Sequence, residues 1–247
     1  MDLQAILFDV NGTLIDIETE DESEETFSIL GRFLIYQGIA LAAHEIRGLY
    51  LDTMKRQRVA SSESFPEFDA TGIWREILDG QWMEKGCPIP GERREQLPLF
   101  LAELHRGIAM RRLVPYPDVA VVLEALKSRY SLAIVTDAQS AYARTELAAV
   151  GLLSYFDHVV VSGDKGYRKP DRRLFADALG RVHALPEQAI FVGNDMYRDV
   201  FGARELGMKT VFFPTEWGEK HHEGTEPDYV IHRFAQLLDA VEFLAAR

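Results

Sequence analysis

The sequence predicts an α/β protein in which a doubly wound parallel sheet carries an inserted, all-helical domain. Two observations predict this fold. Short apolar runs alternate with helical patterns in the second half of the chain, which is the pattern of a parallel sheet covered by helices on both faces. Residues 16–113 instead show helical periodicity without strand patterns. We therefore expect an α/β core formed by residues 1–15 and 114–247, and a helical cap domain formed by residues 16–113.

The first element is expected to be a buried strand. Residues Gln4 to Phe8 form a continuous apolar run that ends at Asp9, as a strand does when it is covered on both faces. The turn-forming pair Asn11 and Gly12 follows. The first loop of the protein is therefore predicted to begin at Asp9.

The later core elements are predicted from the same two patterns. Four further apolar runs are expected to be strands: Leu132 to Val135, His158 to Val161, Ala189 to Val192 and Thr210 to Phe213. The intervening helical patterns are Ala120 to Arg129, Ala141 to Val150, Arg172 to Leu179 and Asp199 to Leu206.

The inserted domain is expected to contain four helices. Apolar residues recur at helical spacing in Thr26 to Gln37, Ala42 to Arg58, Ile73 to Met83 and Arg93 to Ile108. The acidic run from Glu18 to Glu25 precedes the first of them. Carboxylates stabilise the positive end of a helix, so we interpret this run as a solvated helix start rather than as a rim of the substrate site.

Composition narrows the classes of partner. Hydrophobic residues make up 47% of the chain and charged residues 27%, which is typical of a folded globular protein. The formal net charge of -12 disfavours nucleic acid and leaves a small anionic molecule as the expected substrate. Cys87 is the single cysteine, and the N-terminal apolar run is too short to span a membrane. These features predict a cytoplasmic protein without a membrane partner, and they predict no oligomeric state.

Polar residues gather where the predicted strands end. Because ligands of an open parallel sheet bind beyond the carboxyl ends of its strands, these residues are expected to converge. They are Asp9, Asn11, Gly12 and Thr13 after the first strand, Thr136 and Asp137 after the second, Lys169 in a later loop, and Asn194, Asp195 and Asp199 near the end. Such groups are costly inside a protein unless they are paired or bound to a cation.

These motifs resemble those of the haloacid dehalogenase superfamily: an Asp-x-Asp-Gly-Thr loop, a Ser or Thr, a Lys and a final acidic loop. The resemblance covers the α/β core and all four motifs in order. It implies that Asp9 is a nucleophile that forms a covalent aspartyl intermediate. It also implies that Thr136 binds the transferring group and that Lys169 neutralises negative charge.

The resemblance further implies a magnesium ion. Asp9, Asn11 through its backbone carbonyl, and the loop that contains Asn194, Asp195 and Asp199 would supply its oxygen ligands. The substrate would contact the set Asn11, Gly12, Thr136, Asp137 and Lys169. Some of these residues have structural alternatives, since Thr136, Asp195 and Asp199 are also residue types that cap helices.

Two positions depart from the pattern of the phosphatases in this superfamily. Asn11 stands where they carry a second aspartate that acts as general acid and base, and an amide cannot transfer a proton in this way. Asn194 stands where the acidic loop usually begins with an aspartate. The metal ligand from this loop would then be Asn194, Asp195 or Asp199, and the sequence leaves this choice open.

Three functions are compatible with this pattern. The first is a Mg²⁺-dependent phosphatase of a small phosphorylated metabolite, slowed by Asn11. The second is a metal-independent 2-haloacid dehalogenase, because a halide leaves without a proton. The third is a binding or regulatory protein with little turnover. Retention of Asp9 and Lys169 favours chemistry, and the acidic final loop favours the phosphatase.

Overall fold

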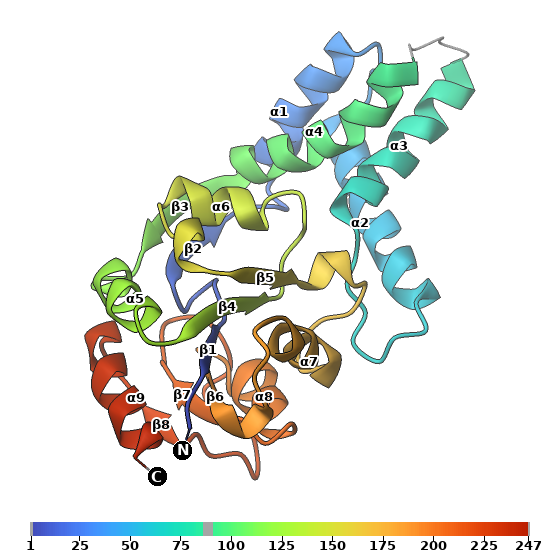
Figure 1. Cartoon of the computed structure of the whole chain (residues 1–247). Coiled ribbons are helices and arrows are strands. Elements are labelled where there is room, and N and C mark those ends of the chain that lie inside the picture. The colour runs from blue at the N-terminus through green and yellow to red at the C-terminus, as the bar shows by residue number, and fades with distance from the viewer. Residues whose placement is uncertain (1, 86–90, 247) are drawn as a thin grey trace. The chain divides into compact units, whose positions relative to one another are not determined.

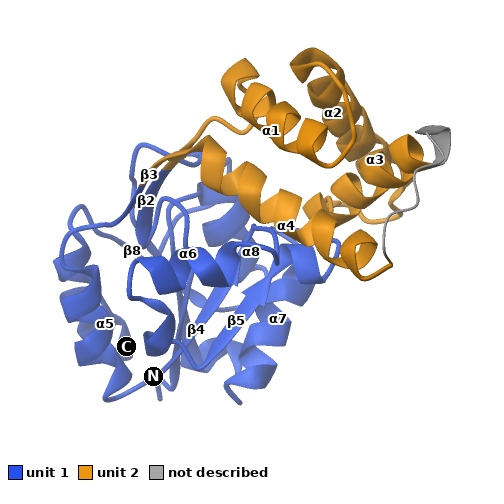
Figure 2. Ribbon diagram, turned by 90° about the horizontal axis from the view of Figure 1, so that it is seen from above, with its two compact units in different colours: residues 1–17, 113–247 blue, residues 18–112 orange. Residues whose placement is uncertain are grey.

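The computed structural model of the chain describes residues 2–85 and 91–246, so Cys87 lies outside the described residues. Contacts between Cα atoms divide the chain into two compact units (Figure 2), unit 1 with residues 1–17 and 113–247 and unit 2 with residues 18–112. The sequence-based expectation set these limits at residues 16 and 113. In the described ranges, no helix combines the length and the apolar character that crossing a membrane requires.

Unit 1 is built on a parallel sheet, as the alternating pattern predicted. In the described part of the chain this sheet has six strands in the order β5-β4-β1-β6-β7-β8, with β1 at its centre (Figure 1). The strands are β1 (Ala5–Phe8), β4 (Ser131–Thr136), β5 (His158–Val161), β6 (Ala189–Gly193), β7 (Lys209–Phe212) and β8 (Tyr229–Val230). Ile6 pairs with Leu132 on one side and Ile190 on the other, which aligns the carboxyl ends of the three central strands.

Helices cover both faces of the sheet, which confirms the doubly wound fold. Alternate residues of β1 face opposite sides: Ile6 and Phe8 enter a core with one group of helices, and Ala5 and Leu7 enter a core with the other. The first group is α5 (Val119–Lys127), α6 (Ala143–Ala149) and α9 (Leu237–Ala245). The second group is α7 (Arg172–Arg181) and α8 (Gly202–Arg204).

The predicted helix from Asp199 to Leu206 takes a different form. A π-helical turn, Met196–Phe201, precedes the short α8. The N–H groups of Asp199 and Val200 both donate to the carbonyl oxygen of Asp195, at 3.0 and 3.1 Å. Such wide turns are rare and occur often at functional sites. This turn brings the Asp199 carboxylate back over the start of its own loop.

Unit 2 consists mainly of helices. Its helices are α1 (Glu24–Tyr36), α2 (Ala43–Ala60), α3 (Ala70–Lys85) and α4 (Gly91–Ala109). α1 and α3 each pack against both α2 and α4. Apolar side chains from the four helices are fully buried between them, among them Leu30, Ile46, Trp74 and Leu101. The predicted helix start is present for the end of the acidic run only: Ser23 caps α1 and its first turn contains Glu24 and Glu25, whereas Glu18 lies on a strand, Ile15–Thr19.

Several elements were not anticipated from the sequence. β2 (Ile15–Thr19) and β3 (Met110–Pro115) form a separate two-stranded sheet, and the division between the units falls within these two strands. β8 and α9 add an edge strand and a helix after the last predicted strand.

Candidate active site

Three strand ends bring the predicted residues to one edge of the sheet in unit 1. Asp9 follows the last residue of β1, and its N–H donates to the carbonyl oxygen of Val192 on β6 at 3.0 Å. Thr136 is the last residue of β4, and Asn194 follows the last residue of β6. The parallel register therefore places Asp9 between the other two strand ends.

Lys169 joins two carboxylates at the centre of this edge. Its Nζ donates to Oδ1 of Asp9 at 2.7 Å and to Oδ1 of Asp199 at 2.6 Å. The three residues are at most 6% exposed. Lys169 is thus not the solvated side chain that a lone lysine usually is, and one buried cation faces two buried anions.

This network sets the protonation of its members. Burial lowers the pKa of Lys169, but the nearby Asp199 and Asp9 carboxylates outweigh it and raise that pKa above its ordinary value. Burial raises the pKa of Asp199, while Lys169 opposes the rise. A lysine held in this way stays charged, and it can neutralise negative charge that arrives with a substrate.

Asp137 holds the segment that carries Lys169. Its Oδ1 accepts a hydrogen bond from the backbone N–H of Lys169 at 2.8 Å. Its Oδ2 lies 3.5 Å from Nε of Arg168 and 3.9 Å from Nη1 of Arg198. Asp137 therefore contacts the protein's own cations and orients the lysine loop.

Three buried side-chain oxygens in this region have no hydrogen-bond partner in the described structure: Oγ1 of Thr136, Oδ1 of Asn11, and Oδ2 of Asp137, which faces the Arg168 and Arg198 guanidinium groups. Thr136 is 1% exposed, and its hydroxyl caps no helix. Since buried polar groups are nearly always paired, such atoms at a strand end suggest groups that await a ligand. Thr136 therefore does not have the helix-capping role that the sequence left as an alternative.

The loop after β1 makes a close turn around Asn194. Gly12 has a φ of +83°, and a Cβ atom there would lie 2.2 Å from Nδ2 of Asn194, so only glycine fits. Thr13 follows, and its Oγ1 lies 3.0 Å from Oδ2 of Asp9 and 3.3 Å from Oδ1 of Asn194. Thr13 thereby links the first loop to the last one.

The three acidic-loop candidates have different partners. Asp195 caps the π-helical turn, because its Oδ1 accepts from the N–H groups of Tyr197 and Arg198 at 3.0 and 2.7 Å. Its Oδ2 accepts from the Arg198 guanidinium at 2.8 Å and from the N–H of Glu219 at 3.0 Å. Both oxygens of Asp195 are thus engaged in structural contacts.

Asp199 is also engaged. Its Oδ2 accepts from the N–H groups of Asn194 and Asp195, both at 3.0 Å, while its Oδ1 accepts from Lys169. Among the three candidates, Asn194 presents an oxygen whose partner in the described structure is the Thr13 hydroxyl.

The loop after β7 is part of the site, and the sequence analysis missed it. Thr215 Oγ1 donates to the carbonyl oxygen of Gly12 at 2.6 Å. The Asn194 amide donates to Thr215 and to the carbonyl oxygen of Trp217. The rule that ligand sites follow strand ends applied equally to the strand predicted from Thr210 to Phe213, so this signal was available in the sequence.

The site offers a hard cation several oxygen donors but no cluster of carboxylates in the described residues. In residues 2–85 and 91–246, no group of three or more His, Cys, Asp or Glu side chains is arranged around a common metal position. The loops do supply oxygen donors: the Asp9 carboxylate, the unpartnered Asn11 Oδ1 and the Asn194 Oδ1. Oxygen donors are what Mg²⁺ prefers, and it usually keeps several waters, so this set fits Mg²⁺ with a single carboxylate ligand.

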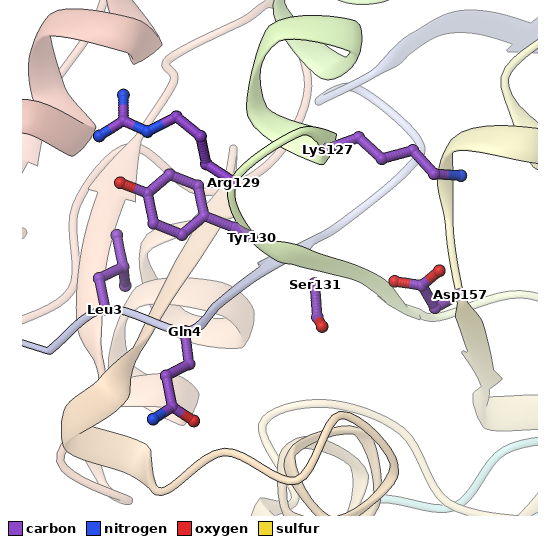
Figure 3. Close-up of a pocket in the computed structure, with 7 residues that line it drawn as sticks. All are labelled: Leu3, Gln4, Lys127, Arg129, Tyr130, Ser131 and Asp157. Atoms are coloured by element: carbon purple, nitrogen blue, oxygen red, sulfur yellow. The ribbon is translucent and has the colours of Figure 1, made fainter.

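A pocket of about 440 Å³ lies at the opposite edge of the sheet (Figure 3). Its lining includes Gln4, immediately before β1, and Ser131, the first residue of β4. It is therefore at the amino ends of the central strands and is separate from the edge that carries Asp9.

The sequence matches a known family. A family profile described as haloacid dehalogenase-like hydrolase covers residues 3–207. The chain belongs to this family. Its sequence is 36% identical over 123 residues to a glyceraldehyde 3-phosphate phosphatase of Pyrococcus furiosus, an alignment that covers 49% of this chain and 51% of the relative.

Other relatives and solved structures are similar. A phosphoserine phosphatase of Thermus thermophilus is 33% identical over 60% of this chain and 59% of the relative. The chain thus spans between half and three fifths of the length of these two curated relatives. The crystal structure of a 2-haloacid dehalogenase from Pseudomonas syringae is 21% identical, with a TM-score of 0.68 over 98% of this chain and 99% of that one. This last likeness supports the fold alone.

Proposed function

We propose that this hydrolase is a Mg²⁺-dependent phosphatase of a small phosphorylated metabolite, with Asp9 as its nucleophile. The observation that carries the proposal is the buried network in which Lys169 bridges Asp9 and Asp199. It presents the Asp9 carboxylate beside a buried cation that can receive a phosphate. The names of the sequence relatives, which are phosphatases of small metabolites, support this substrate class.

The proposed reaction has two displacements. One carboxylate oxygen of Asp9 forms a bond to phosphorus while the bond from phosphorus to the leaving-group oxygen breaks. Water then attacks the phosphorus of the resulting acyl phosphate, inorganic phosphate leaves and Asp9 is regenerated. Covalent catalysis of this kind replaces one difficult step by two easier ones.

Each neighbouring side chain has a proposed task. Lys169 offsets the charge of nucleophile and phosphate, and the unpartnered Thr136 hydroxyl donates to a phosphoryl oxygen. A bound Mg²⁺ would reduce the repulsion between the anionic carboxylate and the anionic substrate. We assign its ligands to Oδ2 of Asp9 and Oδ1 of Asn194, whose partner is the Thr13 hydroxyl, and to the backbone carbonyl of Asn11. Asp195 and Asp199 are left out because both oxygens of each already accept from backbone N–H groups or from a cation.

Asn11 limits this chemistry. The departing oxygen needs a proton, and an amide does not supply one, so the proton comes from water. General acid-base assistance contributes roughly 10²- to 10⁴-fold in rate. We therefore propose slow turnover, with preference for esters whose leaving groups need little protonation. Unit 2 is proposed to act as the cap domain that selects the substrate.

A paired assay tests the proposal. Purified protein is given p-nitrophenyl phosphate or 2-chloropropionate, each with Mg²⁺ and with EDTA. Phosphate release that needs Mg²⁺ and disappears in Asp9→Asn supports the proposal, as does a phosphorylated Asp9 peptide detected by mass spectrometry. Metal-independent chloride release would identify a dehalogenase instead, and no release of either product would indicate a binding protein.

A further inference from the structure

The loop after β7 holds the Asn194 side chain in one orientation. Nδ2 of Asn194 donates to the carbonyl oxygen of Trp217 at 3.1 Å and to Oγ1 of Thr215 at 3.2 Å. Its Oδ1 is left on the side of Thr13, 3.3 Å from that hydroxyl. Turning the amide over would bring its oxygen against the Trp217 carbonyl oxygen, which is also an acceptor.

Donors and acceptors in this contact match one for one. The Asn194 amide offers two hydrogens and the Thr215 hydroxyl offers one. The acceptors are the carbonyl oxygens of Trp217 and Gly12 and the Oγ1 of Thr215; each receives one hydrogen bond from these donors, and the Trp217 oxygen also accepts one from Nζ of Lys220. Gly218 permits the close approach, since its φ is +80° and a Cβ atom there would lie 2.6 Å from the Asn194 carbonyl oxygen.

An aspartate does not fit the same contact. With a carboxylate at position 194, the Thr215 hydroxyl would supply one hydrogen for two acceptors, the carboxylate and the Gly12 oxygen, and the Trp217 oxygen would keep only its bond from Lys220. One of these two acceptors would then have no partner, and the carboxylate would lie against the Trp217 carbonyl oxygen, at a site where Asn194 is 3% exposed. The geometry of the loop therefore discriminates between an amide and a carboxylate.

We propose that the segment from Thr215 to Trp217 selects asparagine at position 194, and that Thr215 is a positioning residue that turns the amide oxygen toward Asp9 and Thr13. The use of that oxygen as a neutral Mg²⁺ ligand rests on the proposed function. Partners behind a metal ligand typically change metal affinity by about 10- to 100-fold when they are removed. Thr215 thus reaches the cation only through Asn194.

Mg²⁺ binding by isothermal titration calorimetry tests the positioning role. Thr215→Val is expected to raise the Mg²⁺ Kd at least about tenfold, while Thr215→Ser, which keeps the hydroxyl, stays within about threefold of the wild type. Thr210→Val is the matched control, because it removes a hydroxyl that donates to Asp228 and contacts neither Asn194 nor its loop. An unchanged Kd in Thr215→Val, or an equal loss in Thr210→Val, would overturn the role.

Thermal unfolding in EDTA tests the selection of asparagine without metal or substrate. Asn194→Asp is expected to lower Tm by about 2–10 °C, because one acceptor loses its partner and a carboxylate lies against the Trp217 carbonyl oxygen. Asn11→Asp is the control, since it also adds a negative charge near Asp9 but has no bond to this loop. Equal Tm values for the two variants would refute the selection, whatever the wild type does with Mg²⁺ or phosphate esters. A wild type that binds no Mg²⁺ and hydrolyses no ester would refute the proposed function alone.

Discussion

Asn11 is the residue at which the proposed chemistry is weakest. Its buried Oδ1 has no hydrogen-bond partner among residues 2–85 and 91–246, and its amide cannot exchange protons with the leaving group or with water. We expect Asn11→Asp to raise kcat for a phosphate ester with a poor leaving group by at least about tenfold, as part of what general acid-base catalysis supplies. The gain should be smaller for p-nitrophenyl phosphate, whose leaving group needs no proton. Equal kcat values in variant and wild type for both esters would show that another group already transfers the proton.

Thr136 is a second residue with a separable role. An unpaired buried hydroxyl costs roughly 1–3 kcal/mol, so Thr136→Val should leave the free energy of unfolding unchanged or higher. If the hydroxyl binds the phosphoryl group, the same change should lower kcat/KM about 100-fold. Urea unfolding and steady-state kinetics on one preparation measure both effects. A loss of stability together with activity would instead assign Thr136 a structural hydrogen bond.

Among the elements, α4 carries a histidine into the core of unit 2. His105 is 4% exposed, its Nε2 lies 2.7 Å from the carbonyl oxygen of Asp21, and its ring meets the rings of Phe27, Tyr50 and Trp74 edge-on. Burial lowers the pKa of His105, although the Asp21 carbonyl and carboxylate oppose this. The neutral imidazole is therefore the form that this core accommodates.

This burial predicts a pH-dependent stability. The unfolded chain protonates His105 near its ordinary pKa of about 6.5 and the folded chain at lower pH, so the unfolded state binds more protons between the two values. The contribution is complete above that pKa and is lost as pH falls through the lowered one. We expect Tm to fall between pH 7.5 and about pH 5.5, and to fall less steeply in His105→Gln. If Tm falls equally with pH in the wild type and in His105→Gln, protonation of His105 is not the cause.

The π-helical turn after β6 has a function that an ordinary helix start would not serve. Asp195 caps it and Asp199 folds back onto the backbone of Asn194 and Asp195. One acidic side chain is thereby used for structure and the other for holding Lys169. This division of tasks leaves Asn194 as the member of the loop with an oxygen directed toward Thr13.

For the whole molecule, the main feature is that each unit has its own buried core. Trp74 and Trp82 are buried in unit 2, whereas Trp217, in unit 1, is 43% exposed. We expect Leu30→Ala, which costs about 2–5 kcal/mol in the core of unit 2, to lower the urea midpoint read from Trp74 and Trp82 more than the midpoint read from Trp217. The Trp217→Phe background leaves the fluorescence of Trp74 and Trp82 in unit 2. The double Trp74→Phe and Trp82→Phe background leaves the fluorescence of Trp217 in unit 1.

Leu7→Ala in the core of unit 1 is the matched substitution and should produce the reverse order. Its side chain is fully buried between the sheet and α7. Equal shifts of both midpoints in both variants would show that the two units unfold as one.

The sequence alone determined the fold class and the edge of the sheet at which the polar residues gather. Both follow from information that is local in the chain: apolar runs of strand length, helical spacing between them, and polar residues directly after Phe8, Val135 and Val192. Short strands such as β2, β3 and β8 are not encoded in that way and were missed, and α9 was missed although its buried apolar residues have helical spacing.

The tertiary structure decided how the polar residues divide their roles. Asn194, Asp195 and Asp199 are all oxygen-bearing residues in one short segment, and only their partners distinguish them. Those partners are distant in sequence: Thr13 for Asn194, Glu219 for Asp195 and Lys169 for Asp199. Hydrogen bonds are short-ranged and directional, so their pairing depends on where the sheet brings separate loops together. The selection of asparagine by the loop at Thr215 has the same origin.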